Sequence, residues 1–96
     1  MLSTDELIAR AEIGDEGRRF LESDLGKTML GLALQEVQTA QEALEKVSPS
    51  DIKKIMDLQQ QARLGRKFEE WLTYLIADGE EAMNVWKQQQ ENQHGR

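Results

Sequence analysis

The stretch LGLALQEVQTAQEALEKVSPSDIKKIMDL, residues 30–58, decides the fold class. Before its Ser-Pro turn, apolar residues recur at intervals of three and four, which places them on one side of an α-helix. They are Leu30, Ala33, Val37, Ala40, Leu44 and Val47. The spacing is that of a heptad repeat, and its alanines allow a partner helix to approach closely. With Ser23 as a suitable N-cap, the pattern predicts a helix over residues 24–47.

The turn Ser48-Pro49-Ser50-Asp51 separates this helix from the next. Proline cannot continue the first helix, but it suits the first position of the second. Ser48 is the expected cap, and Asp51 stands where it would complete a capping box. Because so short a connection reverses the chain, the sequence predicts an antiparallel hairpin of two long helices.

The second long helix is predicted to span residues 49–89. At 100° per residue, its apolar residues up to Ala62 lie on one side, and those from Leu64 to Trp86 lie about 150° round. Either Gly65 kinks the helix so that both sides reach one core, or the helix continues and its halves contact different neighbours. We favour the second, because one glycine costs a helix only ~1 kcal/mol. The later residues keep their phase across Gly79, which predicts a close contact there.

The ends of the chain carry weaker patterns. Ser3 and Glu6 resemble a capping box, and the glycines of the Gly14–Gly17 stretch suggest a break. We therefore expect two short helices, residues 4–13 and 17–22, docked on the hairpin through Phe20 and Leu21. Residues 90–96 contain no apolar side chain and are expected to be a disordered polar tail. The fold class is thus all-α, with a single helical domain over residues 1–89.

Charge and composition exclude several kinds of function. The 96 residues carry a net charge of −6 and no cysteine. A net negative charge disfavours binding to nucleic acid and to anionic membranes, and no apolar run approaches the ~20 residues of a membrane span. We expect a protein partner, neither nucleic acid nor membrane, and a cytoplasmic location.

No residue constellation typical of catalysis is present. His94 is the only histidine and lies in the polar tail, without partners to hold a metal or a proton. The carboxylates fall on predicted solvent sides, whereas acid–base catalysis needs pKa values driven apart by burial. The basic group of Arg63, Arg66 and Lys67 is interpreted as a solvated surface that pairs with nearby acidic residues. The sequence therefore predicts no enzymatic activity, no cofactor and no metal site.

The two long helices differ in length, which predicts an interaction surface. At 1.5 Å per residue, the first spans about 36 Å and the second nearly 60 Å. The first helix therefore ends opposite about residue 73, and apolar residues beyond it need cover from the N-terminal segments, another copy of the chain or another protein. Exposed apolar surface of this extent marks interaction sites. The predicted interface residues are Phe68, Trp71, Leu72, Leu75, Ile76, Met83 and Trp86.

Three stretches carry a resemblance: FLESDLG at residues 20–26, residues 47–58, and FEEWLTYLIADGEEA at residues 68–82. The first resembles the opening, the second the turn and second helix, and the third the C-terminal helix of small helical proteins encoded by tailed bacteriophages and prophages. The resemblance implies a phage origin, no known enzymatic activity, and a small virion-associated or assembly protein of the bacterial host cytoplasm or the virion.

Two functional hypotheses follow. The first is a phage-derived helical protein that self-associates, or docks on a larger virion or assembly protein, through apolar helix sides. The second is a small acidic inhibitor or regulator of a host protein, whose acidic N-terminal half supplies the contact. Binding of the second kind weakens as the salt concentration rises.

Overall fold

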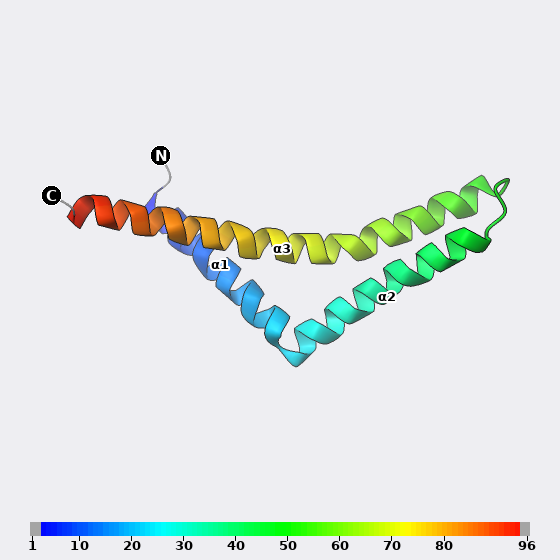
Figure 1. The fold of residues 1–96 in the computed structure, drawn as a ribbon, viewed down its shortest axis with the longest axis horizontal. Coiled ribbons are helices and arrows are strands. Elements are labelled where there is room, and N and C mark those ends of the chain that lie inside the picture. Colours follow the sequence, from blue (N-terminus) through cyan, green and yellow to red (C-terminus); the bar gives the residue numbers. More distant parts are fainter. Residues whose placement is uncertain (1–2, 95–96) are drawn as a thin grey trace.

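The structure is a computed structural model that describes residues 3–94. These residues form three helices and no strand: α1 (Thr4–Glu22), α2 (Asp24–Lys46) and α3 (Ile52–His94). In Figure 1, α1 and α2 lie one after the other along α3, with α2 beside its N-terminal half and α1 beside its C-terminal half. The all-helical class is therefore confirmed.

The prediction of two short N-terminal helices is wrong, because α1 is one uninterrupted helix of 19 residues. The expected break fell at Gly14, yet none of the described glycines has a positive φ. Gly14 is instead needed for packing: a Cβ built on it would lie 2.7 Å from the Cα of Gly79 in α3. Close packing of the two backbones there offsets the ~1 kcal/mol that a glycine costs a helix.

Ser23 alone forms the corner between α1 and α2. Its N–H donates to the carbonyl oxygens of Arg19 and Phe20, and its Oγ accepts the N–H of Gly26 at 3.0 Å. Ser23 thus ends one helix and caps the next, as expected for the second of these roles. A Cβ at Gly26 would overlap the carbonyl oxygen of Phe20, so the sharp corner requires glycine at this position.

The predicted start of the third helix is wrong by three residues. The helix begins at Ile52, because Asp51 is its cap: the Asp51 carboxylate accepts the N–H of Lys54 at 3.2 Å. The hydroxyl of Ser48, the expected cap, lies 2.9 Å from that of Ser50 within the turn. Aspartate is as good an N-cap as serine, so the same segment offers two caps in different registers.

The α3 helix runs without a break through Gly65 and Gly79, as we favoured. A Cβ on Gly65 would lie 2.6 Å from Val37 Cγ2 of α2. The corresponding atom on Gly79 would lie 2.7 Å from the Gly14 Cα of α1. The two halves of α3 therefore contact different neighbours.

Both neighbours nevertheless lie on one side of α3, which corrects the predicted change of side. Gly65 and Gly79 are two heptads apart and so occupy the same helix side. The line that they share reads Leu58, Gly65, Leu72, Gly79 and Trp86. The buried Ala62 and Ala82 flank this line from opposite sides, which made one packing surface look like two.

The predicted tail is also corrected. The α3 helix continues to His94, so residues 90–94 are helical, and residues 95–96 lie outside the described part. Glutamine and glutamate are good helix formers, and Gln89 and Gln90 are half-buried. Absence of apolar residues was therefore insufficient to predict disorder there.

The molecule is a thin plate of helices. Its extents are 69 × 30 × 16 Å, and its radius of gyration is 19.6 Å, against about 12.5 Å for a compact chain of this length. Among the described residues, the buried apolar side chains are Leu7, Val37, Ala40, Ala62 and Ala82. Three of these five are alanines, so the packing inside one chain buries little apolar area.

Candidate protein-binding surfaces

The predicted interface residues fall into two groups in the structure. Trp71, Leu75 and Met83 are 62%, 37% and 39% exposed. The others, Phe68, Leu72, Ile76 and Trp86, are half-buried. The α1 helix covers the part of α3 that extends beyond α2. Of the three kinds of cover considered, the N-terminal segments, another copy or another protein, it is the first. A role of the seven residues in binding another protein stays a prediction.

Aromatic packing joins the α1–α2 corner to the middle of α3. The rings of Phe20 and Phe68 meet edge to face, with centroids 6.4 Å apart and planes at 75°. Edge-to-face pairs contribute ~0.5–1.5 kcal/mol beyond the area they bury. Phe20 thus anchors the α1–α2 corner on α3, as the sequence predicted, and its ring covers part of the Phe68 side chain.

Ion pairs hold α1 to α3 on either side of the glycine contact. Arg10 donates two hydrogen bonds to the Asp78 carboxylate, at 2.7 and 2.9 Å. Arg18 donates to Glu80 at 2.9 Å. The hydrogen bonds from Arg10 lower the pKa of Asp78 below its ordinary value of 3.8, against the opposing effect of partial burial. These pairs could not be predicted from the sequence, because the partners are more than 60 residues apart.

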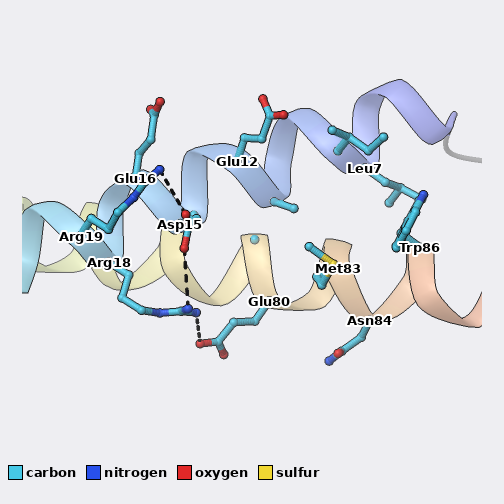
Figure 2. Close-up of a pocket in the computed structure, with 14 residues that line it drawn as sticks. Leu7, Glu12, Asp15, Glu16, Arg18, Arg19, Glu80, Met83, Asn84 and Trp86 are labelled. Carbon is cyan, nitrogen blue, oxygen red and sulfur yellow. Dashed lines mark hydrogen bonds and ion pairs between the residues drawn. The ribbon is translucent and has the colours of Figure 1, made fainter.

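A groove of about 710 Å³ opens between α1 and the C-terminal part of α3. Figure 2 shows Leu7 facing Trp86 at one end and the ion pairs of Arg18 with Asp15 and Glu80 at the other. The Nε1 atom of Trp86 is enclosed and has no hydrogen-bond partner in the described part of the chain. Met83 also lines this groove.

A further set of exposed apolar residues lies on α2, outside the predicted interface. Leu25, Met29 and Leu32 are 64%, 41% and 59% exposed. They are spaced by four and three residues, and so form a second stripe on α2 beside the 30–47 stripe that packs on α3. Their spacing is visible in the sequence, where it indicates that α2 is covered on more than one side.

The described residues hold no group of three or more His, Cys, Asp or Glu side chains placed to bind a metal ion. None of the helices within residues 3–94 is both long and apolar enough to cross a membrane.

Comparisons with protein-family models, with curated proteins and with solved structures find no match to this chain.

Proposed function

We propose that the chain is a non-enzymatic helical interaction protein, which acts by associating through the apolar sides of its helices. One observation carries the proposal. Of the large apolar side chains described, thirteen are at least 37% exposed, whereas Leu7 alone is fully buried. Scattered apolar residues are normal on a protein surface, but a surplus of this size over the core is typical of a chain that packs against another.

The energetics support the same proposal. Burying one large apolar side chain fully contributes roughly 1.5–3 kcal/mol. In the isolated chain this contribution is largely missing for Leu25, Leu64 and Trp71, which are all more than 60% exposed. Covering such residues with another protein surface would add stability that the thin intrachain core does not supply.

The partner is either a second copy of the chain or a larger protein. The resemblance to small helical phage proteins supports a virion or assembly protein as the larger partner, and a phage origin for the chain. A second copy and a larger protein would each bind through the same apolar helix sides, so the proposed mode of action is the same for both partners.

The alternative, an acidic inhibitor of a host protein, has less support. Asp15, Asp78 and Glu80 make ion pairs with arginines of α1, so part of the negative charge is neutralised within the chain. An inhibitor that relies on charge would keep such carboxylates available for its target.

Binding of the dye 8-anilinonaphthalene-1-sulfonate at submicromolar protein tests the proposal. The dilute chain is expected to bind the dye on its open apolar sides, and binding should fall as rising concentration brings a partner copy. A chain that is monomeric by sedimentation and helical by circular dichroism, yet binds no dye, would contradict the proposal, because its apolar sides would then be covered internally.

A further inference from the structure

One flat side of the plate carries about half of the large apolar side chains that are at least 37% exposed. The hydrogen bond from Gln61 to Glu36, at 3.1 Å, shows which side of α2 meets which side of α3. Residues three, four and seven apart share a helix side. On α2, Glu36 therefore shares its side with Met29 and Leu32, and on α3, Gln61 shares its side with Leu64.

The same flat side continues through the middle of the molecule. On α3, Leu64 is followed at heptad spacings by Trp71 and Leu75. Leu75 lies beside Ile13 of α1, with which it lines a shallow depression. We call this surface the central apolar face, and define it by Leu25, Met29, Leu32, Leu64, Trp71 and Leu75, which are 37–64% exposed.

We infer that the central apolar face is the contact between two copies of this chain, packed face to face as a homodimer. The inference rests on the proposed function and names its partner. A plate only 16 Å thick is little more than one helix layer, since a helix with its side chains is about 10–12 Å across. Stable domains pack two layers around one core, and a second copy supplies the missing layer.

The amount of exposed surface area also favours a second copy. The chain exposes 7486 Å², whereas a compact protein of its mass exposes about 5,600 Å². Each copy thus exposes about 1,900 Å² more than a compact fold over its whole surface, and two copies together about 3,800 Å², so an interface of the roughly 2,000 Å² at which obligate homodimers begin would use about half of this excess.

The composition of the face fits a contact of this kind. Tryptophan and methionine are enriched at interfaces, and anchors cluster near the interface centre. Trp71 lies near the middle of α3, with Leu64 and Leu75 on either side. Both copies carry a charge of −6, so an apolar centre is the part of the surface that adds no charge of its own to their mutual repulsion.

Sedimentation equilibrium tests the dimer with a matched pair of variants. Trp71→Glu and Met56→Glu each add one negative charge at a site 62% and 61% exposed, but Met56 lies on the side of α3 opposite Gly65 and α2. The wild type and Met56→Glu are expected at twice 11.0 kDa. Trp71→Glu should raise the dissociation constant at least about thirtyfold. Equal masses for the two variants would overturn the inference.

Acrylamide quenching of Trp71 separates failure of the dimer from failure of the proposed function. The measurement uses a Trp86→Phe background, in which Trp71 is the tryptophan that remains and the unpartnered N–H of Trp86 is removed. A dimer with a shielded Trp71 supports both the dimer and the proposed function. A monomer with accessible Trp71 overturns the dimer but leaves the face open for another protein. A monomer with shielded Trp71 overturns both, because the chain then covers this face by itself.

Discussion

At the scale of single residues, two glycine contacts set how closely the helices approach. Gly14 and Gly79 bring the backbones of α1 and α3 together, and Gly65 does the same for α2 and α3. The sequence predicted a close contact at Gly79 from the apolar phase around it. It could not predict the partner, because nothing near Gly14 distinguishes a glycine required for packing from one that breaks a helix.

Substituting these glycines tests the contact. Gly14→Ala should lower the free energy of unfolding by about 1–2 kcal/mol, since overpacking exceeds the gain in helix propensity. Gly31→Ala is the matched control, because a Cβ there meets nothing within 4 Å. It should raise stability by up to ~1 kcal/mol. Thermal unfolding followed by circular dichroism measures both, and a stabilising Gly14→Ala would contradict the observed approach of the helices.

The Arg10–Asp78 ion pair predicts a specific pH dependence. Because the folded pKa of Asp78 lies below its ordinary value, the pair stabilises the fold above that ordinary value, which is the pKa of the unfolded state. This stabilisation is lost as the pH falls through the folded pKa.

Asp78→Asn should therefore lower stability at pH 7 and reduce the further loss on acidification below about pH 4. Urea unfolding at several pH values measures the effect. Glu69→Gln, at a carboxylate with no ion pair among residues 3–94, is the control and should change the profile little. Parallel profiles for wild type and Asp78→Asn would refute a role for the pair.

At the scale of elements, the sequence predicted most of the helical content but fewer of the boundaries. The 30–47 stripe packs on α3 as its spacing predicted, with Val37 and Ala40 buried. Boundaries failed where local signals were ambiguous: glycines within α1, two possible caps after Pro49, and a polar stretch at the end of α3. In each case the helix boundary was decided by a tertiary contact or a competing cap, which helix propensity alone does not predict.

The cap of α3 offers a test at this scale. Asp51→Ala should lower stability by about 1 kcal/mol, because it removes the acceptor for the Lys54 N–H. Ser48→Ala should have a smaller effect, since its hydroxyl interacts only within the turn. The denaturant midpoints of the two variants decide between the caps, and a larger loss for Ser48→Ala would restore the predicted register.

At the scale of the whole molecule, the arrangement of helices decides what remains exposed. The sequence predicted that apolar residues of α3 beyond α2 need cover, and it placed the interface at residues 68–86. In the structure α1 provides part of that cover, which leaves exposed apolar residues in the middle of the plate and on α2. This could not be read from one helix at a time, because the central apolar face combines residues from separate helices.

Salt dependence distinguishes the two functional hypotheses. Two copies at −6 each repel one another, and salt screens that repulsion over a Debye length of about 8–10 Å at physiological strength. Raising sodium chloride from low to physiological concentration should therefore strengthen dimerisation. An acidic inhibitor bound to a basic target would instead lose affinity under the same change.

The most direct test of the account is the thermal midpoint of the wild-type chain at 1 and 100 μM. If folding depends on association with a second copy, a hundredfold rise in protein concentration adds about 2.7 kcal/mol to the free energy of unfolding of the dimer. The thermal midpoint should then rise by roughly 5–10 °C. A cooperative transition with the same midpoint at both concentrations would contradict the central claim, because it would show a chain that is stable alone.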